Sequence, residues 1–345
     1  MIDFCSQQFT CPLESPFSTS SGKLTEKTFL MLQVSHKDKD GYGEFSVSPS
    51  LKAGTLEENR QSIADFCANL THCDLTPDKV TETILSLTRL MPAPAASGLS
   101  SALLDLACKI NDLSIPEIIG LELKDDLKSC LTLGRDETNF SDADLEKNFS
   151  YIKIKIENKS EEKSRLSQVA NNHALPLWLD AEGENFTVEE FLDIIRDVPS
   201  DKLYLIEDVI PPLKPQKLWI ENKPRNLLTF CDKGIFSLED ITNAQEHFDG
   251  VVIKPLRFGG ILPSLMAIEL ARSYGLKIAL GCYTESDLSL SSWMYLASLC
   301  DFVDMDGSYR LKNQPFSSIL HTETGIKVPK QLALGNRYIE NRISN

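Results

Sequence analysis

A strict alternation of apolar and charged residues marks the segment 151–157, which reads Tyr-Ile-Lys-Ile-Lys-Ile-Glu. Isoleucine occupies positions 152, 154 and 156, and lysine occupies positions 153 and 155. A period of two residues predicts a β-strand with both ammonium groups on one face. Because half-exposed strands commonly alternate in this way, the segment by itself favours a face that is open to water.

Downstream of about residue 128, apolar segments of strand length alternate with segments of helix length, such as Leu262–Tyr274. We predict eight strands, at Cys130–Gly134, Tyr151–Ile156, Leu177–Asp180, Leu203–Glu207, Leu227–Cys231, Gly250–Lys254, Lys277–Gly281 and Phe302–Asp304. Strands separated by helices imply parallel pairing and, most economically, a closed α/β barrel. An open doubly wound sheet is the alternative, but the glycine-rich turn that usually follows its first strand is absent at 133–136.

The first 125 residues show a mixed pattern that predicts a separate α+β domain. Strands are predicted at Lys27–Val34 and Tyr42–Val47, and helices at Glu57–Leu70 and Pro77–Leu87. Between Leu99 and Ile110 the apolar residues recur every three or four positions, which predicts an amphipathic helix with Ser97 as a candidate N-cap. The polar segment Ser18–Lys23 favours an exposed loop.

Length and composition indicate an ordinary globular protein of more than one domain. The chain has 345 residues, of which 42% are hydrophobic and 25% charged, whereas single domains usually have about 100–200 residues. No apolar run approaches the roughly 20 residues that span a bilayer, and the first residues lack a signal-peptide pattern. Nine cysteines without paired spacing favour free thiols in a reducing compartment. We therefore expect a cytoplasmic protein.

The formal charge of −15 argues against nucleic acid and anionic membranes as partners. It is compatible with a carboxylate-lined metal site, although it does not demonstrate one.

Three successive predicted strands carry an acidic residue at their carboxyl end: Asp180 and Glu207 are last in theirs, and Asp232 directly follows Cys231. The separations are 27 and 25 residues, and each corresponds to one strand-and-helix unit. Acids at successive strand ends project into the same barrel mouth and repel one another unless a cation lies between them. A single acid there is commonly a helix N-cap, but three in register favour a site for Mg²⁺.

The opposite wall of the predicted barrel carries a lysine. Lys254 ends the apolar strand that begins at Gly250, and it is followed by Pro-Leu-Arg-Phe-Gly-Gly. Lys155 lies on the second strand and Lys254 on the sixth, so they face one another across the mouth, with the acids on the strands between them. Two lysines placed in this way can act on opposite faces of one bound carbon atom.

This set of motifs resembles the enolase superfamily, in particular its muconate-lactonising subgroup. The matching segments are Lys153-Ile154-Lys155, Asp180-Ala181, Ile206-Glu207-Asp208, Lys254 with Gly259-Gly260, the strand-seven segment 281–286 and the turn Gly41-Tyr42-Gly43-Glu44. The resemblance covers nearly the whole chain. It implies a (β/α)7β barrel, a modified TIM barrel, over residues 126–310. It also implies an α+β capping domain made of residues 1–125, to which the C-terminal segment 311–345 returns.

A pair of acids at the last strand, Asp304 and Asp306, resembles the dipeptide epimerases, where such acids hold the α-ammonium group of the substrate. A cationic amine favours two carboxylates, and a substrate carboxylate favours the metal. An ordinary Asp-Gly turn is the alternative. The resemblance implies an isomerase whose small-molecule substrate is a dipeptide and whose cofactor is one Mg²⁺ per active site.

The implied mechanism is a two-base 1,1-proton transfer at the α-carbon of the C-terminal residue, through an enediolate. Lys155 or Lys254 removes the proton, the lysine on the opposite face returns one, and Lys153 helps the metal to stabilise the charge. A lysine base must be neutral, so we expect its pKa to fall.

Several residues around the site depart from the subgroup pattern or remain candidates for substrate contact. Glu182 replaces the usual Asn, Val209 replaces a Pro, and Lys233 replaces an acid; each would alter how firmly the metal is held. Candidate substrate-binding residues are Thr132, Gly22, Lys23, Cys282 and Tyr283. The arginine that some relatives use for glutamate has no counterpart near Gly22, so a preference for L-Ala-D/L-Glu is not secured.

Three alternatives remain open. The same scaffold could carry an o-succinylbenzoate synthase or an N-acylamino-acid racemase, but neither needs acids to hold an amine. A barrel that binds a ligand without catalysis is the third, with only the departures in its favour. Whether the protein is a homo-oligomer and which dipeptides it prefers are not determined by the sequence.

Overall fold

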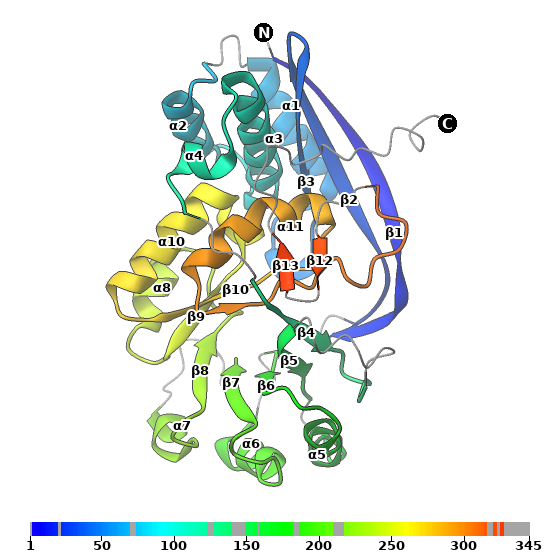
Figure 1. Ribbon diagram of the computed structural model, residues 1–345, viewed down its shortest axis with the longest axis vertical. Coiled ribbons are helices and arrows are strands. Elements are labelled where there is room, and N and C mark those ends of the chain that lie inside the picture. Colours follow the sequence, from blue (N-terminus) through cyan, green and yellow to red (C-terminus); the bar gives the residue numbers. More distant parts are fainter. Residues whose placement is uncertain are drawn as a thin grey trace.

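The protein consists of a small antiparallel sheet with helices and a larger parallel sheet that curls into a barrel (Figure 1). The structure, a computed structural model, describes residues 2–19, 22–69, 74–122, 127–139, 149–157, 159–182, 186–209, 217–315, 320–322 and 325–327.

The N-terminal part is built on three antiparallel strands in the order β1-β2-β3. These are β1 (Asp3–Thr19), β2 (Gly22–His36) and β3 (Lys39–Phe45), and the helices that follow them are α1 (Leu56–Asn69), α2 (Pro77–Leu87), α3 (Ala93–Asn111) and α4 (Ile115–Ile119). The segment predicted as a polar loop instead lies at the tip of the long β1–β2 hairpin, where Thr19 pairs with Gly22. Ser20 and Ser21 lie outside the described residues.

Helix α3 begins earlier than its apolar pattern predicts. Pro92 is the N-cap, and Pro94 lies in the first turn, where the missing N–H of a proline costs no intrahelical hydrogen bond. Ser97 therefore lies inside the helix and is fully buried. The prediction of Ser97 as the N-cap was wrong, because the first turn is formed by alanine and proline residues that carry no amphipathic signal.

Eight parallel strands form the second sheet, in the order of the chain. They are β4 (Ser129–Leu133), β5 (Phe149–Lys155), β6 (Leu177–Asp180), β7 (Leu203–Glu207), β8 (Leu228–Cys231), β9 (Gly250–Ile253), β10 (Lys277–Leu280) and β11 (Phe302–Val303). Each coincides with a predicted strand to within a few residues.

The seam between β4 and β11 is bridged by side chains. The backbone N–H of Met305 donates to Ser129 Oγ at 2.7 Å, and the backbone N–H of Thr132 donates to an Asp306 carboxylate oxygen at 2.6 Å. The sheet is thus a nearly closed barrel, and the predicted fold class is confirmed.

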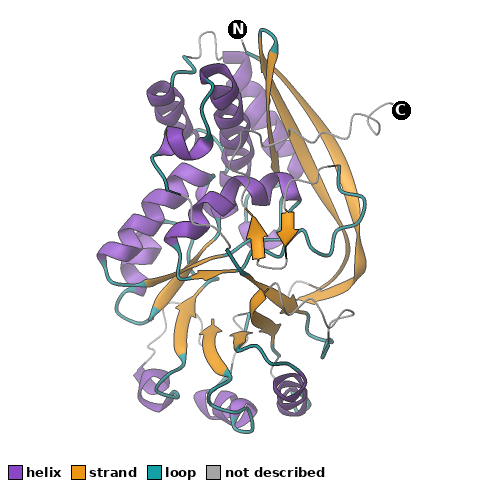
Figure 2. Cartoon of the chain, in the orientation of Figure 1, coloured by secondary structure: helices purple, strands orange, loops and turns teal. Residues whose placement is uncertain are grey.

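Helices cover the outside of the barrel, as Figure 2 shows in purple around the orange strands. The helices of this part of the chain are α5 (Glu162–Asn172), α6 (Val188–Ile195), α7 (Lys217–Asn222), α8 (Leu238–Ala244), α9 (Pro255–Phe258), α10 (Ile261–Ser273) and α11 (Asp287–Trp293). Predicted helix Leu262–Tyr274 corresponds to α10. Helix α3 packs against α9 and α11, so the N-terminal part rests on the carboxyl ends of the later barrel strands.

After the barrel the chain returns to the N-terminal sheet. Leu311 forms an antiparallel bridge with Leu13, and the Lys312 N–H donates to the Pro12 carbonyl at 2.8 Å. Two short strands follow, β12 (Leu320–Thr322) and β13 (Gly325–Lys327). Most of the remaining C-terminal segment lies outside the described residues, so the domain boundaries stay predictions.

Within the described ranges, no helix is both long and apolar enough to cross a membrane.

Candidate active site

The barrel interior is an apolar layer with a polar layer directly above it. Seven inward-facing residues, one on each of β4 and β6–β11, form a buried apolar cluster: Cys130, Trp178, Leu205, Phe230, Val252, Ala279 and Phe302. Because side chains two residues apart on a strand share a face, the residues two positions later face the same axis at the barrel mouth. Six of them are polar: Thr132, Asp180, Glu207, Asp232, Lys254 and Asp304.

The three predicted metal ligands lie next to one another in this polar layer. Asp180 pairs in register with Glu207 on the neighbouring strand, and Asp232 directly follows the next strand, β8. All three side chains are buried, Glu207 completely. The Trp178 indole N–H donates to Glu207 at 2.7 Å, which fixes that carboxylate from below.

The ammonium group of Lys153 lies among these acids. It is 2.7 Å from Asp304, 3.1 Å from Glu207 and 3.5 Å from Asp180, and only 2% of the surface of Lys153 is exposed. Burial alone lowers the pKa of Lys153, but the surrounding carboxylates raise it well above its ordinary value. This lysine therefore stays charged and balances part of the negative charge of the cluster.

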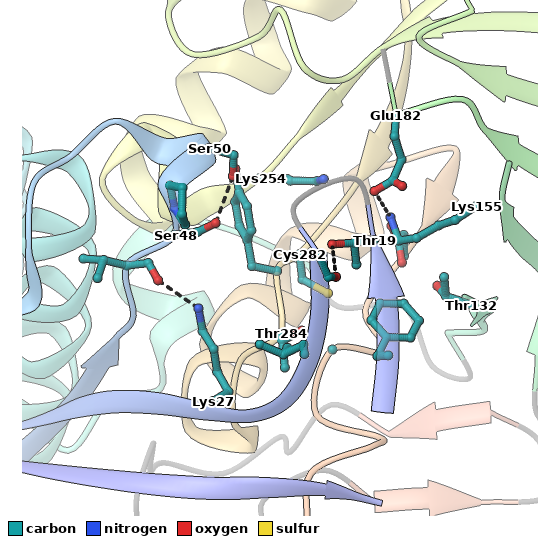
Figure 3. Close-up of a pocket in the computed structure, with 18 of the residues that line it drawn as sticks. Thr19, Lys27, Ser48, Ser50, Thr132, Lys155, Glu182, Lys254, Cys282 and Thr284 are labelled. Carbon is teal, nitrogen blue, oxygen red and sulfur yellow. Dashed lines mark hydrogen bonds and ion pairs between the residues drawn. The ribbon is translucent and has the colours of Figure 1, made fainter. Parts of the chain in front are cut away.

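Lys155 and Lys254 approach the same space from opposite walls, and in Figure 3 their amines point toward one another. Lys155 Nζ lies 3.1 Å from Asp180 Oδ2 and 3.1 Å from Glu182 Oε1. Lys254 Nζ lies 2.8 Å from Asp232 Oδ2 and 5.2 Å from the centre of the Tyr283 ring. Two amines thus flank one acidic cluster.

The chain's own charges raise the pKa of both lysines, so the fall that a neutral base requires would depend on the positive charge of the metal. Burial lowers the pKa of Lys155, but Asp180 and Glu182 raise it by more. Burial likewise lowers the pKa of Lys254, and Asp232 raises it. The reason is the carboxylate beside each amine, which stabilises the charged form.

The donor set fits a hard divalent cation. Mg²⁺ favours carboxylate oxygens, and few protein ligands leave room for substrate oxygens. Among the described residues, Glu207 Oε2 accepts no hydrogen bond although it is buried, and the Lys153 ammonium lies 3.1 Å from it. Burial raises the pKa of Glu207 well above its ordinary value, whereas the neighbouring lysines and Arg257 hold the pKa of Asp180 and Asp232 down against the effect of burial. A cation would relieve the mutual repulsion of these acids.

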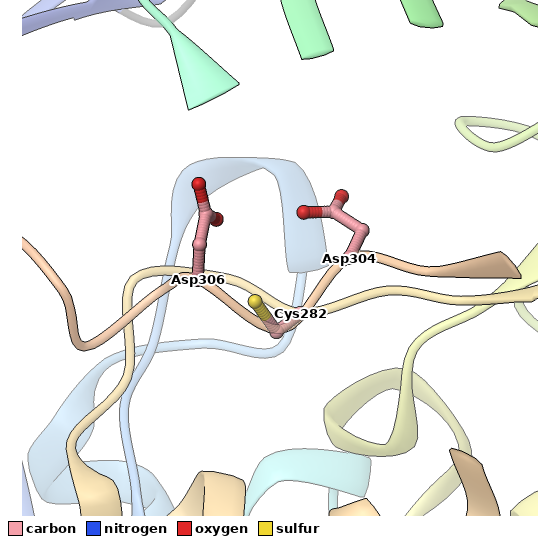
Figure 4. A group of neighbouring side chains, drawn as sticks. All are labelled: Cys282, Asp304 and Asp306. Atoms are coloured by element: carbon pink, nitrogen blue, oxygen red, sulfur yellow. The ribbon is translucent and has the colours of Figure 1, made fainter. Parts of the chain in front are cut away.

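A second acidic group, at and after the end of β11, adjoins the first through Lys153; Figure 4 shows its side chains. Carboxyl oxygens of Asp304 and Asp306 and the Cys282 sulfur all lie within 4.8 Å of one another. Burial and the charge of Asp304 raise the pKa of Asp306 to about 6, and the Thr132 N–H bound to it opposes this. Lys153 balances part of the negative charge of Asp304. The two carboxyl groups together can still bind one further cation, such as an ammonium group.

Apart from Glu207, which is completely buried, the acids and lysines of the site line a cavity of about 900 Å³ between the barrel mouth and the N-terminal part. Thr132, Cys282 and Tyr283 line it from the barrel, and Gly22 and Lys23 line it from the β1–β2 hairpin. All candidate substrate-binding residues are therefore brought to one cavity. Two further lysines that the sequence did not single out, Lys27 and Lys52, also line it.

The residues that depart from the subgroup pattern include two that contact one another. Lys233 Nζ donates to the backbone carbonyl of Glu182, and Arg135 Nε donates to the Glu182 carboxylate at 2.7 Å. Val209 is buried in an apolar core cluster.

Arg257 was missed by sequence reasoning. Its guanidinium donates to Asp232 Oδ1 at 3.0 Å and to the Tyr283 hydroxyl at 2.8 Å. The available signal was its position three residues after Lys254, one turn along α9, which places both on one side of the short helix.

Comparison with known proteins supports the same assignment of fold. No protein-family model matches the chain. An L-Ala-D/L-amino acid epimerase of Pedosphaera parvula is 26% identical over 312 residues, which cover 86% of this chain and 88% of that protein.

Two solved structures resemble this one over almost their full length. The dipeptide epimerase of Methylococcus capsulatus, complexed with Mg and the dipeptide L-Arg-D-Lys, has a TM-score of 0.82 at 21% identity, with 96% of this chain and 98% of that one covered. The muconate lactonizing enzyme of Pseudomonas fluorescens, complexed with muconolactone, has a TM-score of 0.82 at 18% identity, with 96% and 95% covered.

The predicted resemblance is confirmed: the relatives are epimerases of dipeptides, which are isomerases, and the structural neighbours include a dipeptide epimerase and a muconate lactonizing enzyme.

Proposed function

We propose that this protein is a Mg²⁺-dependent dipeptide epimerase, which inverts the α-carbon of the C-terminal residue by a two-base proton transfer. The observation that supports the proposal most directly is the pair of amines, Lys155 and Lys254, on opposite sides of one carboxylate cluster. The similarity of this protein to an L-Ala-D/L-amino acid epimerase over 86% of the chain supports the same reaction class.

In the proposed reaction Asp180, Glu207 and Asp232 hold Mg²⁺. When bound, Mg²⁺ would draw electron density from the substrate carboxylate and so make the neighbouring α-proton more acidic. The same positive charge would offset the carboxylates that raise the pKa of the two lysines, and so favour a neutral amine.

One lysine takes the α-proton while the electron pair of the broken C–H bond is delocalised into the substrate carboxylate. The ammonium group of the other lysine then donates a proton to the opposite face of the carbon, and the configuration is inverted. Lys153 stays charged beside Glu207 and Asp304 and stabilises the extra negative charge. Asp304 and Asp306 hold the α-ammonium group of the dipeptide.

The test is incorporation of solvent deuterium. A library of dipeptides is incubated with the protein and Mg²⁺ in D₂O, and the C-terminal α-carbon is examined by NMR and chiral chromatography. Wild-type protein should give an inverted, deuterated product, and EDTA should abolish it. Lys155→Met and Lys254→Met should each lose epimerisation by about 100-fold or more, while each still exchanges the α-proton of the one epimer that faces its remaining lysine.

The matched control is Lys277→Met, because Lys277 is an exposed barrel lysine at the start of β10. It should leave inversion and exchange unchanged. If no dipeptide gains deuterium at its C-terminal α-carbon, the binding protein without catalysis becomes the better interpretation. Metal-dependent loss of water from the substrate of o-succinylbenzoate synthase would identify that reaction instead.

A further inference from the structure

Glu182 is a buried acidic residue beside the site, and the proposed reaction assigns it no role. It follows β6 by two residues, and only 6% of its surface is exposed. Its backbone has a φ of +50°, in the left-handed region that non-glycine residues rarely adopt. Such a conformation persists only where the surroundings impose it, and strained residues of this kind cluster at functional sites.

Four atoms of Glu182 are held by neighbours. Its backbone N–H donates to Asp180 Oδ1 at 2.9 Å, and its carbonyl accepts from Lys233 Nζ. Oε2 accepts from Arg135 Nε at 2.7 Å, and Arg135 is itself held by Glu157 at 2.8 Å. This carboxylate is therefore fixed in position and does not turn freely.

The fourth atom, Oε1, lies 3.1 Å from Lys155 Nζ, as the dashed line in Figure 3 shows. Lys155 thus has two carboxylate partners, Asp180 and Glu182. Among the described residues, Lys254 forms an ion pair with Asp232 alone. The two proposed bases therefore differ in one respect: only Lys155 has an acidic partner that is not a proposed metal ligand.

We infer that Glu182 is a positioning residue for Lys155 and holds the Lys155 amine against one face of the substrate. When Asp180 binds the metal, Glu182 remains as the carboxylate partner of that amine. A lysine side chain has four rotatable bonds, so an amine without a fixed partner samples many positions. Misplacement of a reacting group by about 1 Å can lower a rate by roughly 100-fold. The inference rests on the proposed function.

The first test compares proton exchange on the two faces of the substrate. The variants Lys155→Met and Lys254→Met identify which epimer exchanges through which lysine. In Glu182→Gln, exchange through Lys155 should fall by about 10- to 100-fold, while exchange through Lys254 stays within about twofold. The control is Glu157→Gln, which alters the same Arg135 network without touching Lys155, and it should leave both exchange rates within about twofold.

An equal fall on both faces would mean that Glu182 supports the fold or the metal and not Lys155 in particular. Unchanged or faster exchange through Lys155 would also overturn the inference.

The second test does not depend on turnover. Crystal structures of the wild type and Glu182→Gln with Mg²⁺ should show the Lys155 side chain in one orientation in the wild type and in several in the variant, with Lys254 unchanged. If Lys155 has the same single orientation in both, the inference is wrong whatever the activity. If the wild type exchanges no dipeptide proton at all, the proposed function fails, while the crystal structures still decide the role of Glu182.

Discussion

Replacement of Lys153 by methionine tests whether the acids at the barrel mouth form one charged cluster. The ammonium group of Lys153 lies 2.7 Å from Asp304, 3.1 Å from Glu207 and 3.5 Å from Asp180, and all four side chains are buried. Methionine keeps nearly the same length and apolar volume, so the main change is the loss of one positive charge. The carboxylates are then left without their central partner.

The expected destabilisation follows from these distances. Removal of one partner of a buried ion pair costs about 3–5 kcal/mol, because the remaining charge is uncompensated. For a unit the size of the barrel this corresponds to a fall of about 6–20 °C in melting temperature. Mg²⁺ replaces part of the lost positive charge, so it should stabilise the variant by more degrees than it stabilises the wild type.

The measurement is thermal unfolding by calorimetry, with and without EDTA and over a series of Mg²⁺ concentrations. Lys277→Met, an exposed lysine on the same barrel, serves as the control and should change the melting temperature by no more than about 2 °C. The reasoning would be refuted if Lys153→Met were as stable as the wild type in EDTA and if Mg²⁺ shifted both melting temperatures equally.

Two further predictions concern stability. Burial raises the pKa of Glu44 to about 7, although bonds from Ser286 lower it. The folded protein then keeps a proton that the unfolded chain releases above about pH 4.5, so its free energy of unfolding should fall by up to about 3 kcal/mol between pH 4.5 and 7. Glu44→Gln should make the fall in melting temperature between pH 4.5 and 7 less steep, and an unchanged pH dependence would contradict the assignment. In Gly43→Ala, the new Cβ would lie 2.1 Å from the Gly98 carbonyl oxygen and 2.8 Å from the Ala102 nitrogen. Backbone atoms cannot turn aside, so urea unfolding should show a loss of at least about 2 kcal/mol, and a loss under 0.5 kcal/mol would mean that β3 and α3 separate easily.

The sequence determined the barrel and much of the polar layer at its mouth. The alternation of Ile and Lys at 152–156 places Lys153 and Lys155 on the same face of their strand. Parallel strands bring their carboxyl ends to one edge of the sheet. For that reason Asp180 and Glu207 could be predicted as neighbours, and they pair in register. Lys155 pairs with Asp180 in the same way.

Strand β1 shows where periodicity was insufficient. It runs from Asp3 to Thr19 at the edge of its sheet, and its sequence includes Pro12 and has no regular alternation. A proline in a strand normally argues against that assignment, but an edge strand tolerates it because one side has no ladder to complete. The pairing with β2, which the sequence of β1 by itself does not indicate, makes this segment a strand.

The tertiary structure alone decided which charges meet. Asp304 reaches Lys153 only because β11 closes against β4, and Arg257 reaches Asp232 only because α9 brings it to the segment that follows β8. Glu182 is a departure from a motif in the sequence, but the left-handed turn and the bonds to Arg135 bring its carboxylate to Lys155. Periodicity fixes the face on which a residue lies; the position of a long charged side chain depends on loop conformation and on neighbours distant in the chain, and these are set only when the barrel closes.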